Sequence, residues 1–271
     1  MRAFLVLILM VFSAPVRAAG QETQLLEWTS RTGRMLASYH AALKTATDTV
    51  GSHAGGSNVP GVYAGGPYDD GWAFSFGALE ADTVFVLRYG VIVDGRGSVV
   101  QFEAFAQRRV ASAYHTIAAR ALARTREEFE RTRAKEGFDF AAYRFAVLPF
   151  PSGQVTAFVA PARLRSDVTF AGSDVMYTLA RADLSVLSRT RFHHSLIQLP
   201  VSGPERSAAA VLIVPRAPLP SPVDVLHAIE RRAPLLVAAQ RKVFEITPDG
   251  AVRVVPESDP RVRAIRSSGT R

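Results

Sequence analysis

The sequence predicts an α+β protein in which an N-terminal helix is tethered to a mixed body of helices and β-sheet. Three patterns predict this class. Apolar residues recur every three or four positions over residues 22–50, and apolar and polar residues alternate over residues 71–105. Over residues 208–255 an apolar strand, a capped helix, a second strand and a hairpin follow one another. This third pattern is a strand-helix-strand-hairpin C-terminal unit.

Residues 1–19 have the features of a secretory signal peptide. Arg2 supplies a positive charge, Ala3–Phe12 is an unbroken apolar run, and Ala18 and Ala19 are small residues where a signal peptidase would cut. A membrane-spanning helix needs about 20 apolar residues, roughly twice the length of this run. We therefore expect a periplasmic or secreted product that is not an integral membrane protein after signal cleavage. A retained anchor is the alternative.

The N-terminal helix is expected over residues 22–50, because its apolar side chains share one face. Gly51 is expected to end it. The residues that follow are mostly glycine, serine and other small types that cannot pack a core, so residues 20–58 are predicted to be a helix and a flexible Gly/Ser-rich linker. We expect this helix to be semi-independent of the α+β body, residues 59–256.

Alternation predicts a sheet at the start of the body. A strand-like pattern over residues 83–93 is followed by a turn and a second strand over residues 99–105, which together predict a hairpin. Asp69 and Asp70 are expected to form a turn, because two carboxylates lack the oxygen spacing of a calcium site. Three aromatic residues alternate on one strand face and are expected to build core: Trp72, Phe74 and Phe76.

A long helix is expected after this hairpin and is expected to end at Gly137. Arginines and glutamates give it a solvated face with ion pairs. Its apolar face is expected to contain Val110, Tyr114, Ile117, Ala121 and Phe129. Short strands are then expected at Tyr143–Phe150, Gln154–Ala160, Val175–Ala180, Ser195–Leu199, Ala208–Val214, Leu235–Ala239, Lys242–Thr247 and Ala251–Val255.

The helix that begins at Ser221 has the clearest start signal in the chain. Ser221 is placed as N-cap, Pro222 stands in the first helical position, and Asp224 stands where a carboxylate favours the helix dipole. We expect this helix to run to about Arg232. Residues 257–271 are expected to be a loose, flexible tail.

The chain has no cysteine and a formal charge of +8. Without disulfides, an exported protein must be held together by its core. The absence of cysteine also excludes a thiol nucleophile, a thiolate zinc site and an acylated cysteine. The basic residues are spread along the chain, so they indicate either affinity for anionic envelope polymers and lipid headgroups or an arginine-rich composition without a role in binding. No nucleic-acid partner is expected, because an export signal is present and no aromatic–basic motif is found.

One stretch resembles a known family. Pro215 follows the apolar strand over residues 208–214, and Ser221 and Asp224 stand at the start of the next helix. This order resembles the C-terminal half of a JAMM (JAB/MPN) domain, in which a strand ending in H-x-H-P precedes a P-S-x-x-D sequence. The resemblance would place a degenerate JAMM-like unit over residues 138–256. In that family the two histidines and the aspartate bind zinc, the serine helps to hold the oxyanion, and an upstream glutamate activates water.

Leu212 and Val214 occupy the two histidine positions of that motif. Neither side chain has a lone pair to donate, and Asp224 alone cannot hold zinc. The resemblance therefore implies the fold without its metal and without its catalysis. The alternative is an unrelated α+β domain in which Ser221 and Asp224 are only a helix cap.

The remaining candidates for chemistry are histidines. His193 and His194 are adjacent, and adjacent residues on a strand point to opposite faces, so at most one can face a given pocket. A hydrolase site would have to combine one of them with Asp224, Glu205 or Ser221, residues dispersed along the chain. The alternative is that both histidines lie on the surface.

Nucleophile-elbow, zinc-protease, phosphate-loop and dinucleotide motifs are missing from the sequence. We assign no catalytic, cofactor or metal residue, and expect a non-enzymatic binding or interaction module with an unknown protein or envelope partner. The alternative is an envelope hydrolase with a site assembled from dispersed residues. An imidazole within about 3 Å of a carboxylate at the floor of a pocket would favour the hydrolase.

Overall fold

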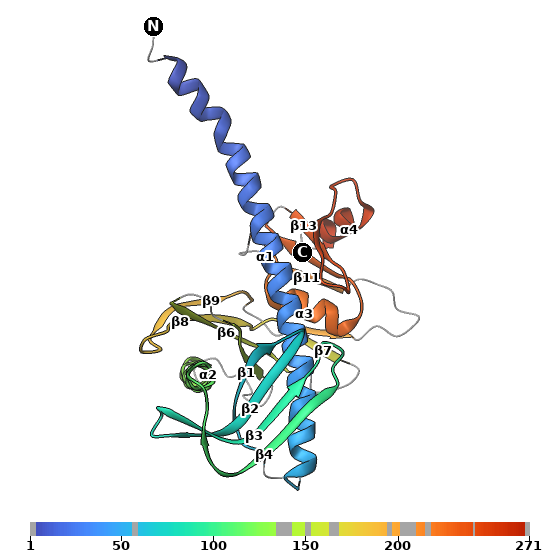
Figure 1. Ribbon diagram of the computed structural model, residues 1–271. Helices are drawn as coiled ribbons and strands as arrows, with labels where there is room; N and C mark the ends of the chain where they lie inside the picture. Colours follow the sequence, from blue (N-terminus) through green and yellow to red (C-terminus); the bar gives the residue numbers. More distant parts are fainter. Residues whose placement is uncertain are drawn as a thin grey trace. The chain divides into compact units, whose positions relative to one another are not determined.

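The computed structural model describes residues 4–55, 59–133, 143–149, 153–162, 168–193, 197–200, 210–214, 218–240 and 242–268. Within these ranges the chain forms helices α1–α4 and strands β1–β14, which confirms the predicted α+β class (Figure 1). The chain divides into two compact units. We call Met35–Val201 the central unit, and Met1–Arg34 with Ser202–Arg271 the terminal unit.

Two four-stranded antiparallel sheets dominate the central unit. Sheet A has the order β1 (Val62–Tyr68), β2 (Gly71–Glu80), β3 (Val84–Val93) and β4 (Val99–Val110). Sheet B has the order β5 (Tyr143–Val147), β6 (Gln154–Pro161), β8 (Val175–Ala180) and β9 (Val186–Arg191). A separate antiparallel pair consists of β7 (Val168–Ala171) and β10 (Ile197–Pro200).

Sheet A contains the hairpin that alternation predicts. Asp94 stabilises the turn between β3 and β4, because its Oδ1 accepts hydrogen bonds from the backbone N–H groups of Arg96 (3.0 Å) and Ser98 (2.8 Å). Asp69 and Asp70 form the predicted turn between β1 and β2. The alternating aromatic residues are buried as predicted: Trp72, Phe74 and Phe76.

Helix α2 (Ala113–Arg133) lies between the two sheets, with β6, β8 and β9 on one side and β1–β3 on the other (Figure 1). Its apolar side chains share one core with both sheets, and the ring of Phe129 meets that of Phe145 edge-on at 5.7 Å. Val110 does not belong to this helix as predicted. Strand β4 continues five residues beyond Phe105, so Val110 is its last residue, and the Val110 side chain is 50% exposed. The predicted end at Gly137 lies outside the described residues.

Helix α1 (Phe4–His53) contributes to both units. In the central unit the ring of Tyr39 meets those of Trp72 and Phe74 edge-on at 5.0 and 5.3 Å. The helix is therefore not the semi-independent element that the sequence indicates, and it continues through Gly51. Its fully buried side chains in this unit are those of Leu36, Tyr39, Ala46 and Val50. Among the described residues, none of the helices combines the length and the apolar character that crossing a membrane requires.

The terminal unit contains a four-stranded sheet in the order β11 (Ala210–Val214), β12 (Leu235–Ala239), β13 (Lys242–Ile246) and β14 (Val252–Val254). Strands β11 and β12 are parallel, and helix α3 (Pro222–Arg231) connects them. Residues 20–34 of α1 pack within this unit, where Ser30 Oγ donates a hydrogen bond to the carbonyl of Gly250 (2.6 Å). A Cβ on Gly33 would lie 2.3 Å from Cβ of Val225, so this close approach requires glycine.

The prediction of a loose tail over residues 257–271 is wrong for residues 260–268, which form helix α4 (Pro260–Ser268). Its Val262 and Ile265 are 2% and 8% exposed, and they pack with apolar side chains of the sheet and its C-terminal end. Two apolar residues three positions apart therefore share one buried face of a helix that is otherwise rich in arginine.

Candidate functional site

The structure places the predicted site residues in different surroundings. His193 follows β9 in the central unit, whereas Ser221 and Asp224 open α3 in the terminal unit. His194 and Glu205 lie outside the described residues. The structure therefore describes these residues in two arrangements, one in each unit.

Ser221 and Asp224 form a capping box, which confirms the predicted helix start. The backbone N–H of Asp224 donates to Ser221 Oγ (3.1 Å), and the backbone N–H of Ser221 donates to Asp224 Oδ2 (2.7 Å). Both side chains are buried. The sequence predicts this arrangement because all of its partners lie within four residues.

The zinc of the JAMM family does not fit these residues. One carboxylate oxygen of Asp224 accepts the N-cap hydrogen bond, and Leu212 and Val214 offer no donor atom. In the part of the chain that the structure describes, no three His, Asp or Glu side chains gather as a metal site would require.

His193 pairs with Asp174 in the central unit. Its Nδ1 lies 2.6 Å from Asp174 Oδ1, and the two side chains are 5% and 0% exposed. Asp174 directly precedes β8 and His193 lies just beyond β9, so the pair joins the open ends of one hairpin. The backbone N–H of Phe192 donates to the carbonyl of Asp174 (3.2 Å), and Arg191 Nε donates to the carbonyl of His193 (3.1 Å).

Other polar side chains lie around this pair. The guanidinium carbon of Arg133 lies 4.0 Å from the ring centre of Tyr143 and 4.7 Å from that of Phe129. Burial raises the pKa of the Tyr143 hydroxyl. A carboxylate bonded to an imidazole fixes the orientation of the ring, which is the arrangement that proton transfer uses.

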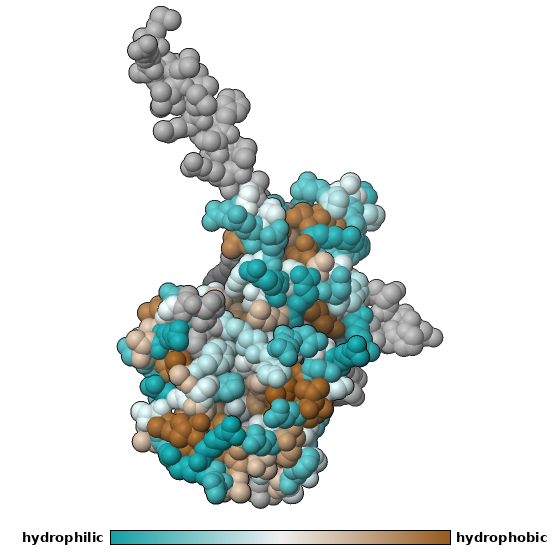
Figure 2. All heavy atoms as spheres, viewed as in Figure 1, coloured by the Kyte–Doolittle hydropathy of each residue, from teal (hydrophilic) through white to brown (hydrophobic). Residues whose placement is uncertain are grey.

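Exposed apolar side chains are dispersed on the molecular surface. Figure 2 shows separate brown patches among teal side chains on the face in view. The most exposed large apolar side chains in the described part of the chain include Val100 (59%), Leu187 (53%) and Val110 (50%). Single exposed apolar residues are usual on protein surfaces, and nothing in the structure shows what would cover these.

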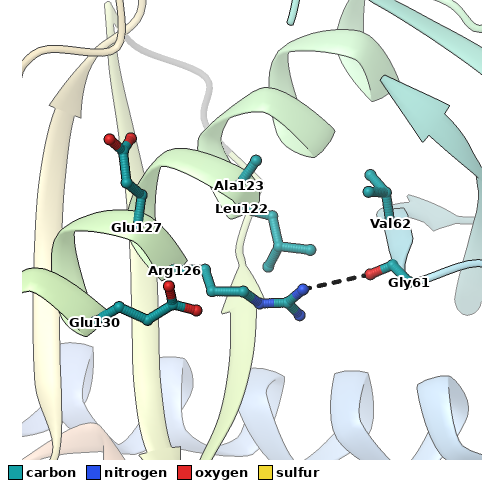
Figure 3. A pocket seen from close by; sticks show the side chains of 7 residues that line it. All are labelled: Gly61, Val62, Leu122, Ala123, Arg126, Glu127 and Glu130. Carbon is teal, nitrogen blue, oxygen red and sulfur yellow. Dashed lines mark hydrogen bonds between the residues drawn. The ribbon is translucent and has the colours of Figure 1, made fainter. Parts of the chain in front are cut away.

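Two hollows adjoin the exposed face of α2. The smaller has a volume of about 190 Å³ and lies between α2 and the start of β1, at Gly61 and Val62 (Figure 3). The Arg126 side chain crosses it, with Nη1 3.5 Å from the carbonyl oxygen of Gly61 and Cζ 5.3 Å from the ring centre of Phe145. Its α2 lining consists of Leu122, Ala123, Arg126, Glu127 and Glu130.

The larger hollow has a volume of about 410 Å³ and shares Ala123 and Glu127 with the smaller one. Helix α2 forms one wall, and two turns form the other. The turn residues are Asp82, between β2 and β3, and Asp183 and Leu184, between β8 and β9. The two hollows therefore lie side by side along one helix face.

Ion pairs order part of this face. Arg124 Nη1 lies 2.7 Å from Glu127 Oε2 and its Nη2 3.7 Å from Glu128 Oε2. Arg131 also bonds Glu128, and this hydrogen bond is the main cause of the lowered pKa of the Glu128 carboxyl. The pKa of Asp183 is lowered as well, because its Oδ1 accepts hydrogen bonds from the backbone N–H (3.0 Å) and hydroxyl (2.8 Å) of Ser185.

Sequence reasoning missed Asp174 and both hollows. Asp174 stands 19 positions before His193, and no short motif links them. The available signal was the predicted strand over residues 175–180, because a hairpin that starts there brings the residues flanking its two strands together. No family model matches the chain, and no curated protein matches it at a significant level.

Proposed function

We propose that this chain is an exported binding protein whose ligand lies along the exposed face of α2 in the central unit. The observation that supports this proposal is the pair of adjoining hollows that share Ala123 and Glu127. Ligand sites are concave and combine apolar lining with a few polar groups. Here Leu79, Leu122 and Ala123 supply the apolar lining, and charged side chains of both signs surround it.

The scaffold around this face is tightly packed. Ala118, Ala119 and Ala121 of α2 are almost fully buried in the core that both sheets share. Turns at the ends of those sheets supply the rim. Binding residues on turns held by a packed scaffold are the usual arrangement in proteins.

The export part of the proposal is supported by the sequence of residues 1–19. It places the protein in the periplasm or outside the cell, with a protein or another envelope component as partner. N-terminal sequencing of the exported product is expected to start at Ala19 or Gly20. An intact Met1 on a membrane-bound form would contradict export with cleavage.

Filling the shared part of the two hollows tests the binding role. A low-molecular-weight envelope extract is expected to raise the unfolding temperature of the mature protein, because a ligand that binds only the folded state stabilises it. Ala123→Trp is expected to abolish this rise, since Ala123 lines both hollows. The matched control is Ala113→Trp, an exposed alanine on the same helix outside both hollows. Equal stabilisation of both variants would contradict the proposal.

A hydrolase is the second candidate, and the contact between His193 and Asp174 favours it. The distance satisfies the requirement for a carboxylate-oriented imidazole, but both side chains are buried and the two hollows lie elsewhere. The test is hydrolysis of a panel of esters and amides by the mature protein and by Asp174→Asn. A loss of about 100-fold or more in the variant would support an acid–base role. No hydrolysis by the wild-type protein would reject it.

A further inference from the structure

The larger hollow is lined by charges of both signs. Helix α2 contributes Arg120 and the paired Arg124 and Glu127, and the two turns contribute Asp82 and Asp183. The hollow measures about 410 Å³, within the range of small-molecule sites. A cavity that presents an arginine from the helix and carboxylates from the facing turns suits a ligand that also carries both charges.

Two of these charges are available for a ligand. Arg124 is already paired with Glu127 and Glu128, and Asp183 with the N–H and hydroxyl of Ser185. In contrast, neither Arg120 nor Asp82 forms an ion pair in the described part of the chain. The guanidinium of Arg120 can donate two parallel hydrogen bonds to a carboxylate, and Asp82 can accept from an ammonium group.

The turns that carry the acidic wall have defined backbone conformations. Asp82 has φ = 56° and Leu184 has φ = 58°, in the left-handed region that a leucine rarely adopts. Leu184 is 4% exposed and belongs to the core of the central unit, which holds its turn in place. Residues held in such conformations cluster at ligand sites.

We propose that the larger hollow binds a small zwitterion, a free amino acid or a short peptide, with its carboxylate at Arg120 and its ammonium at Asp82. This inference rests on the proposed binding function and specifies its ligand class. An amino acid and a dipeptide share this chemistry and differ in the distance between the two charges.

Isothermal titration of the mature protein with L-alanine and with glycylglycine tests the proposal. Each probe is compared with its N-acetylated form, which lacks the ammonium, and with its amide, which lacks the carboxylate. At least one zwitterion is expected to bind, and each derivative is expected to bind about tenfold more weakly or worse. The probe that binds distinguishes the amino acid from the peptide.

Variants assign the two charges. Arg120→Gln is expected to weaken zwitterion binding about tenfold and to leave binding of the amide, which lacks the carboxylate, unchanged. Asp82→Asn is expected to weaken zwitterion binding about tenfold and to leave binding of the N-acetylated form, which lacks the ammonium, unchanged. The matched control, Arg88→Gln, replaces an exposed arginine outside the hollow and is expected to change nothing. Absence of binding by both zwitterions, or binding that ignores these charges, would overturn the ligand class. The binding function itself would survive that result if the envelope extract still stabilises the wild-type protein and not Ala123→Trp.

Discussion

Removal of the Asp174 carboxylate is expected to destabilise the central unit by about 3–5 kcal/mol, because the buried His193 loses the hydrogen bond that its Nδ1 makes to this carboxylate. The two side chains are 5% and 0% exposed, so water does not readily replace the lost hydrogen bond. Asp174→Ala should therefore show the full range, whereas Asp174→Asn keeps an acceptor and should cost about 1–3 kcal/mol.

Urea unfolding followed by Trp72 fluorescence measures these costs in a Trp28→Phe background, because the chain has only these two tryptophans. A double-mutant cycle with His193→Ala gives the coupling energy of the pair. Asp183→Ala is the control, because this exposed aspartate lies in the turn of the same hairpin and accepts its hydrogen bonds from the nearby Ser185. If Asp174→Ala costs no more than this control, or the two single changes are additive, the pair does not hold the hairpin closed.

Three further predictions concern the terminal unit. Gly33→Ala should destabilise it by about 1–3 kcal/mol in thermal unfolding, because the new Cβ would lie 2.3 Å from Cβ of Val225. The control, Gly51→Ala, should not destabilise the protein, because the nearest atom to its new Cβ would lie at 3.6 Å. Equal effects of the two changes would contradict the close packing at Gly33. The Arg261 hydrogen bond holds the pKa of Glu245 below its ordinary value of 4.5, so this stabilisation is present above pH 4.5 and lost as the pH falls further. Glu245→Gln should flatten that acid limb, and an unchanged profile would exclude Glu245 as its cause. Ser221→Ala should cost about 0.5–2 kcal/mol without altering metal content, and stoichiometric zinc that disappears with Asp224→Asn would contradict a cap-only role.

Local signals predicted much of the fold, because their partners are close in sequence. The cap of α3 needs only Ser221 and Asp224, and the β3–β4 turn needs only Asp94 and its next four residues. Docking of α1 could not be predicted in this way. A glycine-rich segment after a helix indicates the flexibility of that segment and not whether the helix packs on the body. The burial of Tyr39 depends on aromatic rings more than 30 positions away in the chain.

The docking of α4 shows the same limit for charged residues. Arg261 bonds the buried Glu245 across 16 positions, so an arginine suggestive of a solvated tail instead holds the helix end against the sheet, where Arg253 of β14 bonds the same carboxylate. An arginine-rich segment is expected to be solvated when its acidic partners cannot be identified from the sequence. The pairing of Asp174 with His193 was hidden for a related reason, since closure of a hairpin brings them together.

The charged face of α2 has a different meaning in the structure from the one that the sequence indicates. Arginines and glutamates at helical spacing predict a solvated surface, and Arg124 and Glu127 do form the expected ion pair. Two features make the face a candidate site. Ala123 has a small side chain where both hollows meet. Asp82 and Asp183 line the larger hollow from turns that are 41 and 60 positions away from Ala123 in the chain. Arg120 thus lines a hollow together with carboxylates and does not face open solvent alone. For this reason we propose a binding site on a helix whose sequence predicts only an amphipathic, solvated face.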